Sequence, residues 1–530
     1  MYYIFNEFFW YRGDTVDKSR TEYAFLNVLT GLGGYILITV LGFVSRMVFV
    51  RCLSSAYLGI NGLFTNILSL LSLAELGVGS AISYELYNPL ANENTKKVAS
   101  LVDFYRKAYI LIGVIVGIFG VILLPFIKGA VGSYPFKENI YVIYLLFLFN
   151  SVISYFFSYR TSLLQADQKQ YVVSATQYVF LFLQNVVQIV FLIVTREYIF
   201  YLVTQIICTV LFNVTISRIA IKKYPYLADK NIEKLSISEI QHILKNIWYL
   251  LTNKLSSILL NSTDNIILSY FKGIVSVGLT SNYVLLTDTL SSFISQFFNG
   301  LTGSIGNYNV LKSREETKEL FYCFNFANFW LFGFGSLGII FVSSDLVNIC
   351  FGNKYVLPIY FPIVLAINFF VVGMMNSIWS FKYALGQFKY GRYIVLLTGI
   401  FNIVFSLILG KQLGLFGIYL ATIISRLLTN FWYEPYALFK YSLHTNPIEY
   451  FIVYIKYVFI YIIAFLFNYL GYNFISLSPI LSLLVHIMMC TIITNIMFYA
   501  FLGKKKEFLF FKRKVMVLIN LIKSKLINKI

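Results

Sequence analysis

Long apolar runs, separated by short polar stretches, extend along nearly the whole chain. A helix needs about 20 mainly apolar residues to cross the roughly 30 Å hydrocarbon core of a bilayer. On that basis the pattern predicts about fourteen transmembrane helices. They cover residues 27–50, 58–85, 108–131, 139–160, 171–195, 198–221, 243–271, 275–303, 320–343, 356–381, 391–411, 415–435, 450–470 and 479–502. No loop between them reaches the roughly 50 residues that a small soluble domain needs.

The composition supports this prediction. Of the 530 residues, 58% are hydrophobic and 12% are charged, and the mean hydropathy is +0.74. Soluble domains carry about 25% charged residues, so polar residues are too few here to cover a water-soluble core. We therefore predict an all-α polytopic membrane protein, with lipid as the solvent for most of its surface.

The net charge of +19 reflects membrane topology. One set of alternate loops, together with both ends of the chain, holds about 32 Lys and Arg residues, and the other set about 7. Because cytoplasmic loops are enriched in Lys and Arg, this split predicts an even number of spans and cytoplasmic termini. The cations lie in short loops beside lipid and not in one folded module, which argues against nucleic acid as a partner.

The same pattern divides the chain into six segments. They are an interfacial N-terminal segment (1–26), an N-lobe (27–221), a cytoplasmic linker (222–242), a C-lobe (243–435), two further spans (450–502) and a basic cytoplasmic tail (503–530). The N-terminal segment lacks the pattern of a cleaved signal peptide, so the first span is expected to direct its own insertion. The tail alternates basic and apolar blocks, which suits a helix on the anionic inner leaflet.

A weak internal repeat relates the two lobes. Leu58-Gly59-Ile60 aligns with Val277-Gly278-Leu279 at an offset of 219 residues, and this offset also pairs Arg46 with Asn265. Both lobes would then contain six spans running in the same direction, which is a parallel repeat.

Motifs for catalysis are absent from the sequence. The three histidines do not lie at metal-ligand spacing, and the five cysteines form no C-x-x-C pair. The chain has no Walker loop, no G-x-S-x-G and no H-E-x-x-H. We therefore expect a protein that is not an enzyme and that needs no metal or other cofactor.

The strongest candidate site lies in the predicted span 243–271. There Lys254 and Asp264 cost roughly 6 kcal/mol at the bilayer centre, while about eleven Ile, Leu and Phe residues return roughly 5. This helix therefore needs polar neighbours. Its polar residues share one helical face, which predicts a cavity wall; they are Lys254, Ser257, Asn261, Asp264 and Asn265.

Other spans also carry ionisable groups, which almost always face a bundle interior or a water-filled cavity. These groups are Arg46, Glu75, Asp288 and Arg426. An isolated carboxylate such as Glu75 costs about 3 kcal/mol at mid-membrane. The alternative for each charge is a buried ion pair or a snorkelling side chain, and for Asp288 that alternative is the stronger one.

Three blocks of the sequence resemble a known family. They are RMVFVRCLSSAYLGINGLFTNILSLLSLAELGVGSAISYELYNPLANEN, NSTDNIILSYFKGIVSVGLTSNY and FWYEPYALFKY, which begin at Arg46, Asn261 and Phe431. They are similar to blocks of bacterial polysaccharide flippases of the Wzx type, in the MOP superfamily with the MATE exporters and the lipid II flippase MurJ. The resemblance implies two six-helix lobes in a V-shaped, pseudo-symmetric, MATE-like arrangement, plus two extra helices.

The resemblance also implies a function. The substrate would be a polyprenyl-diphosphate-linked oligosaccharide repeat unit, flipped from the inner to the outer leaflet of the bacterial cytoplasmic membrane for capsule, exopolysaccharide or O-antigen assembly. A diphosphate favours cationic partners, so we expect Arg46, Lys254 and Arg426 to bind it, with Arg51 at the outer rim. The acidic and amide residues would pair with these cations or bind a coupling H⁺ or Na⁺; they are Glu75, Asp264, Asn261, Asn265 and Asp288.

Partners implied by this family are membrane lipids and the polymerase and chain-length machinery for the polysaccharide. Two alternative functions remain. One is a membrane-integral polysaccharide polymerase or ligase, which should have a large outward loop that this sequence lacks. The other is a MATE-type drug or cation exporter, whose cavity should favour acidic residues over Arg and Lys.

Overall fold

The structure is a computed structural model of the chain and describes most of it. The described residues are 20–72, 85–90, 92–132, 137–167, 169–228, 235–245, 247, 260, 262–311, 313–385, 391–472 and 477–513. Every regular element among them is a helix and none is a β-strand. This confirms the all-α prediction.

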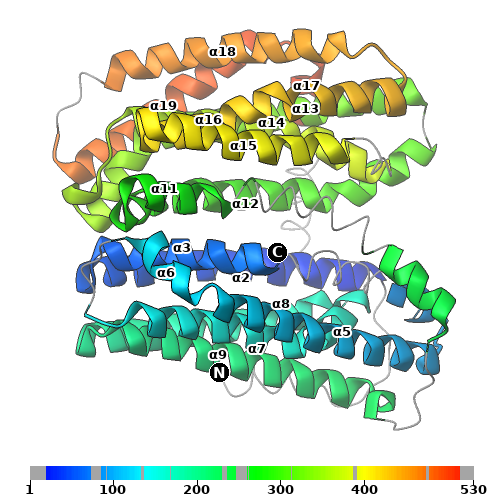
Figure 1. Cartoon of the computed structure of the whole chain (residues 1–530). Helices are drawn as coiled ribbons and strands as arrows, with labels where there is room; N and C mark the ends of the chain where they lie inside the picture. The colour runs from blue at the N-terminus through cyan, green and yellow to red at the C-terminus, as the bar shows by residue number, and fades with distance from the viewer. Residues whose placement is uncertain are drawn as a thin grey trace, which may run out of the picture.

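The helices form two bundles that lie side by side (Figure 1). The N-lobe contains α2 (Arg20–Cys52), α3 (Ser55–Leu71), α5 (Thr95–Ile122), α6 (Leu124–Val131), α7 (Ile140–Ala166), α8 (Gln170–Thr195), α9 (Tyr198–Lys223) and the short η2 (Pro225–Ala228). The C-lobe contains α11 (Asp264–Lys272), α12 (Ile274–Leu311), α13 (Arg314–Phe351), η3 (Asn353–Tyr355), α14 (Tyr360–Ala384), α15 (Arg392–Leu413), α16 (Leu415–Leu428), α17 (Asn430–Ala437) and the π-helical η4 (Leu438–Leu443).

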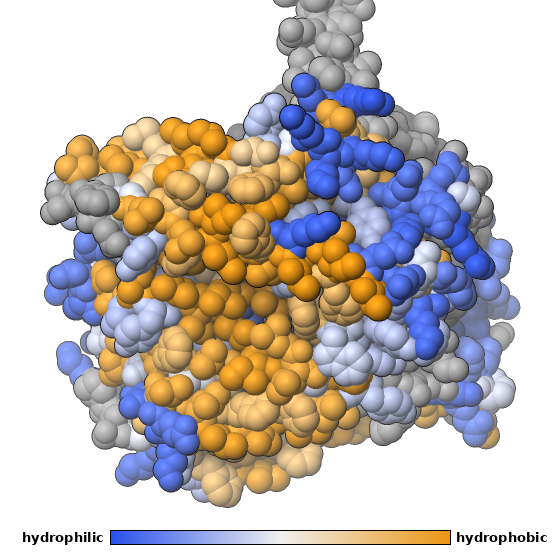
Figure 2. Space-filling view, turned by 90° about the horizontal axis from the view of Figure 1, so that it is seen from above, coloured by the Kyte–Doolittle hydropathy of each residue, from blue (hydrophilic) through white to orange (hydrophobic). Residues whose placement is uncertain are grey.

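Two further helices, α18 (Ile448–Tyr472) and α19 (Pro479–Leu502), pack on the outside of the C-lobe, where α19 lies along α13. His486 of α19 is buried against Asp345 of α13, with 2.5 Å between Nδ1 and Oδ2. Beyond α19, Phe508 and Phe511 pack on Phe326 of α13. Figure 2 shows a broad hydrophobic band on the side of the molecule that α18 and α19 cover, with hydrophilic residues gathered along its right edge.

Eleven described helices are long and apolar enough to cross a membrane. Two of the fourteen predicted spans, 58–85 and 243–271, extend into residues outside the described ranges. The helix of a third, α12, is continuous from Ile274 to Leu311. The multi-pass architecture is therefore confirmed, and the count of fourteen stays a prediction.

The predicted span 108–131 has the wrong boundaries. Helix α5 begins at Thr95, well before the apolar run, and a break at Leu123 separates it from α6. The early start has a local cause, because the Asn94 side chain accepts a hydrogen bond from the backbone N–H of Lys97 and caps the helix. Asp103 then forms ion pairs with Arg106 and Lys107 on the first turns.

Equivalent helices of the two lobes begin about 219 residues apart. Helix α13 begins 219 residues after α5, and α14 begins 220 residues after α7. The two lobes therefore share one order of helices. We call the end of the molecule with the α2–α3 and α11–α12 turns the turn end. The opposite end, where residues 235–245 lie beside the start of α5, is the linker end.

Candidate functional site

The two lobes meet along α3 and α12. Gly59 of α3 lies against the backbone of Ile274, and Gly278 of α12 lies against the backbone of Ser55. A Cβ atom at Gly59 would be 2.1 Å from the Ile274 carbonyl oxygen, and one at Gly278 would be 2.0 Å from the Ser55 oxygen. Only glycine permits backbones to approach this closely. The contact closes the turn end between the lobes.

Arg46 of α2 crosses from the N-lobe to the C-lobe at this closure. Its Nη2 donates to the Ser281 Oγ at 2.5 Å, and its Nε donates to the Asn282 Oδ1 at 3.0 Å. Both acceptors are neutral groups on α12. The guanidinium therefore keeps its full positive charge at the junction of the lobes, since among the described residues no carboxylate forms an ion pair with it.

The repeat explains part of this arrangement. The 219-residue offset pairs Arg46 with Asn265 and Gly62 with Ser281. In the structure the Nδ2 of Asn265 would lie 3.4 Å from a Cβ at Gly62. The two contacts are thus equivalent across the pseudo-symmetry, but only the N-lobe supplies a charge.

Asp264 faces the interior of the C-lobe. It is the first residue of α11, and its Oδ2 accepts a hydrogen bond from the Thr422 hydroxyl of α16 at 3.0 Å. Asn402 of α15 donates to the same Thr422 oxygen at 2.9 Å. The other carboxylate oxygen of Asp264 is buried and has no hydrogen-bond partner, as is the hydroxyl of Ser406 one turn after Asn402.

This oxygen-rich group has the donors that a proton or a hard cation prefers. Arg426, one turn after Thr422 on α16, is close enough to Asp264 for their charges to interact. The two do not form an ion pair, and the Arg426 Nε has no hydrogen-bond partner. No group of three or more His, Cys, Asp and Glu that could hold a metal occurs in the described part of the chain.

Comparisons with known proteins agree with this architecture. The sequence matches no protein-family model, and no curated protein matches it significantly. The fold is similar to that of a lipid II flippase MurJ in an inward closed conformation, with 18% identity over 89% of this chain and 98% of that chain and a TM-score of 0.62. It is also similar to an inward-facing multidrug resistance MATE family transporter of the MOP superfamily, with 15% identity over 76% and 95% of the two chains and a TM-score of 0.55.

The chain has a MurJ- and MATE-like fold. In this fold the predicted polar face of span 243–271 is divided, because Asp264 bonds to Thr422 inside the C-lobe while its neighbour Asn265 lies against α3 of the other lobe. The two residues therefore do not line one cavity wall, as the helical spacing had predicted.

The remaining predicted residues lie apart from these two groups. Arg51 is exposed in the last turn of α2 at the turn end, and Asp288 is exposed on α12, where the structure shows no ion pair for it among the described residues. Lys254, Asn261 and Glu75 lie outside the described residues. The roles predicted for them stay predictions.

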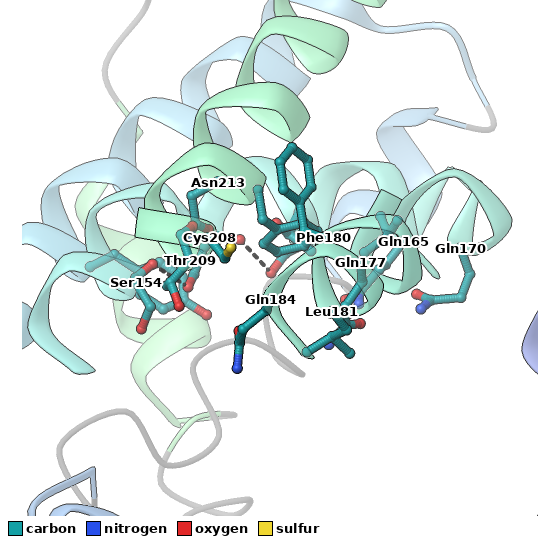
Figure 3. A pocket seen from close by; sticks show the side chains of 16 residues that line it. Ser154, Gln165, Gln170, Gln177, Phe180, Leu181, Gln184, Cys208, Thr209 and Asn213 are labelled. Atoms are coloured by element: carbon teal, nitrogen blue, oxygen red, sulfur yellow. Dashed lines mark hydrogen bonds between the residues drawn. The ribbon is translucent and has the colours of Figure 1, made fainter. Parts of the chain in front are cut away.

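Sequence reasoning missed two polar groups. Lys382 of α14 forms an ion pair with Glu434 of α17, and both side chains are buried at the linker end of the C-lobe. A polar cavity also lies inside the N-lobe, between α7, α8 and α9 (Figure 3). A signal for the cavity was present in the sequence, because Gln170, Gln177 and Gln184 recur every seven residues and so share a face of α8.

Proposed function

We propose that this protein flips polyprenyl-diphosphate-linked oligosaccharide repeat units from the inner to the outer leaflet of a bacterial cytoplasmic membrane, by alternating access, for the assembly of a surface polysaccharide. The observation that carries the proposal is the position of Arg46. It is a cation bound only by neutral groups at the junction of the two lobes.

A diphosphate is a better partner for Arg46 than the groups that now hold it. Charge-assisted hydrogen bonds from a guanidinium to phosphate oxygens are roughly twice as strong as neutral ones, and they are often bidentate. When the lobes separate at the turn end, Ser281 and Asn282 move away from Arg46 with α12. The diphosphate of the substrate then replaces them, so substrate binding favours the separated state.

The Asp264 group supplies coupling. A proton or Na⁺ that binds between Asp264, Thr422 and Asn402 neutralises the carboxylate and draws α11, α15 and α16 together. Because α11 also contacts α3 through Asn265, a change at Asp264 is transmitted to the interface between the lobes. Arg426 competes with the coupling cation for the same carboxylate.

The linker end faces the cytoplasm in this proposal. The predicted cytoplasmic loops contain most of the Lys and Arg residues, and the linker residues 235–245 lie at that end beside Lys97. The division into segments follows the prediction from sequence, with the N-lobe at 27–221 and the C-lobe at 243–435. The polymerase of the pathway would receive the product at the turn end.

A MATE-type exporter of organic cations is the second candidate, since MATE transporters share the fold. It is less well supported because the group at the junction of the lobes is a cation. The acid Asp264 lies inside the C-lobe, where a hydroxyl and an amide pack around it. A drug cation at the junction would therefore be repelled by Arg46.

The test uses a deletion strain and its lipid-linked intermediates. We expect complete repeat units to accumulate and to stay protected from a membrane-impermeant sugar-modifying probe added to spheroplasts. Arg46→Ala should fail to restore export, whereas Arg46→Lys should restore it in part. Accumulated units that the probe labels would show that the protein acts after translocation, as a polymerase or ligase. No accumulation would favour the exporter.

A further inference from the structure

The N-lobe contains a cavity of about 570 Å³ between α7, α8 and α9, in the half of the lobe nearer the linker end. Figure 3 shows Gln170 and Gln177 of α8 on the opposite side of this cavity from Ser154 of α7 and Thr209 of α9. A second cavity, of about 360 Å³, shares Ser154 and Thr209 with the first and continues to α3. The two form one polar tract that reaches the helix where the lobes meet.

The lining of the tract is polar and carries no formal charge. Its side chains are mainly amides and hydroxyls, with Phe180 and Phe212 at one wall. Gln165 and Gln177 are exposed to the cavity, and the structure gives neither side chain a hydrogen bond with any described residue. The Oδ1 of Asn150, which lines the second cavity, is buried without a partner. These groups have unused capacity for donating and accepting hydrogen bonds.

This chemistry excludes charged ligands. A cation or a phosphate placed here would lose its water without gaining an opposite charge, which is costly in a low-dielectric interior. A sugar ring suits the tract, because each hydroxyl both donates and accepts and each amide offers two donors and an acceptor. The aromatic side chains provide an apolar surface for the C–H face of a ring.

The scaffold does not require these polar groups. At the 219-residue offset, Leu396 and Ile403 of α15 occupy the positions of Gln177 and Gln184 of α8. The C-lobe therefore builds the equivalent helix with apolar residues at both positions. The glutamines are a specific property of the N-lobe.

We infer that the N-lobe tract is the binding site for the uncharged saccharide part of the substrate. This inference rests on the proposed function, and it adds a division of labour: Arg46 binds the diphosphate while Gln165, Gln177 and Gln184 bind sugar hydroxyls. The site lies in the half of the molecule nearer the linker end, where the substrate enters.

The test measures binding of a soluble probe to the full-length protein in nanodiscs. The probe is the oligosaccharide released by mild acid from the lipid-linked intermediates of the deletion strain. The double variant Gln177→Leu/Gln184→Leu introduces apolar side chains similar to those of α15. We expect it to bind the oligosaccharide about tenfold more weakly than the wild type, the loss expected for two hydrogen-bonding groups, and Gln177→Ala to show a smaller loss.

The control is Asn185→Leu, on the same helix but outside the lining. The Asn185 amide donates to the carbonyl oxygen of Leu181 in its own helix, so this variant should bind as the wild type does. Thermal unfolding of each variant identifies any that are misfolded, and Gln177→Ala then provides the result.

The outcomes separate this inference from the proposed function. If the wild type binds no released oligosaccharide, or the double variant binds and transports like the wild type, the inference is overturned. If the oligosaccharide binds in a glutamine-dependent way but the intact lipid-linked unit is not moved across a bilayer, the saccharide site stands and the flippase function fails.

Discussion

Gly59 of α3 and Gly278 of α12 occupy equivalent positions in the two lobes, and each packs on the backbone at the start of the other's helix. The partners, Ile274 and Ser55, are also related by the 219-residue offset. The contact is therefore reciprocal, like the interface of a two-fold symmetric dimer. Because it depends on missing side chains, it gives a sharp steric test of the closed turn end.

Gly278→Ala should open the turn end. Its Cβ would lie 2.0 Å from the Ser55 carbonyl oxygen, so the two backbones must move apart, and overpacking of this kind costs about 1–3 kcal/mol. In a cysteine-free background, a cysteine at Thr289 between the lobes should react with an impermeant maleimide at least fivefold faster from the turn end. Transport should fall in parallel.

Gly62→Ala is the matched control on α3. A Cβ at Gly62 would meet Asn265 and Val277 only at 3.4 Å, which is an ordinary contact distance. Its labelling rate should stay within twofold of the wild type. Equal rates in the Gly278 and Gly62 variants would mean that the reciprocal glycine contact does not hold the lobes together.

Arg46 can be tested for charge separately from hydrogen bonding. Arg46→Gln keeps a donor for the acceptors on α12 but removes the charge, whereas Arg46→Lys keeps the charge and loses the fork geometry. If the residue binds a diphosphate, transport should fall at least tenfold in Arg46→Gln and less in Arg46→Lys. The opposite order would indicate that Arg46 only fastens the lobes together.

Asp264→Asn should uncouple transport. The amide keeps an oxygen that can accept from Thr422, so the protein should unfold at a similar temperature, but the charge that binds a coupling cation is lost. Transport into proteoliposomes should then no longer respond to an imposed Na⁺ or H⁺ gradient. A variant that still follows either gradient as the wild type does would remove Asp264 from the coupling mechanism.

The linker should undock in acid. An ion pair with Lys97 and hydrogen bonds from Ser236 lower the pKa of Glu239 from its ordinary value to about 2. The stabilisation is therefore complete above pH 4.5 and is lost as the pH falls toward 2. The Glu239 side chain is 43% exposed, so the pair contributes no more than about 1 kcal/mol.

Hydrogen exchange of residues 237–245 measures this effect. At pH 7, Glu239→Gln should exchange up to about fivefold faster than the wild type, which corresponds to that free energy. The ratio between the two proteins should shrink below pH 4.5. A ratio that stays constant down to pH 2.5 would contradict the assigned ion pair.

The buried pair of Lys382 and Glu434 should matter for stability through its balance of charge. Removing one partner, as in Lys382→Met, leaves an uncompensated buried charge and should cost about 3–5 kcal/mol. Replacing both, as in Lys382→Met/Glu434→Leu, should recover most of that loss. Thermal unfolding in detergent measures both, and a double variant no more stable than the single one would count against this reading.

Much of the fold follows from the apolar pattern. The predicted span 479–502 coincides with α19, and 450–470 differs from α18 by two residues at each end, because lipid sets the length of an apolar helix. The start of α5 was missed, since a cap at Asn94 and ion pairs to Asp103 extend that helix beyond the apolar run.

The site was harder to predict because it depends on contacts between distant segments. Arg46 was identified as a candidate from its position in an apolar run, but Ser281 and Asn282 could not be identified as its partners before the lobes were assembled. The separation of Asp264 from Asn265 has the same cause. Helical spacing places the two on one broad face, and only the packing of α11 between α3 and α16 decides which way each points.

The most direct test of the account is transport by the purified protein. Lipid-linked oligosaccharide extracted from the deletion strain is reconstituted into proteoliposomes, and a glycosidase or periodate is added outside to modify the exposed sugars. With wild-type protein, nearly all of the pool should become accessible, whereas protein-free vesicles and Arg46→Gln should leave about half protected. If the protected half persists with the wild type, under any imposed ion gradient, the protein is not a flippase for this lipid.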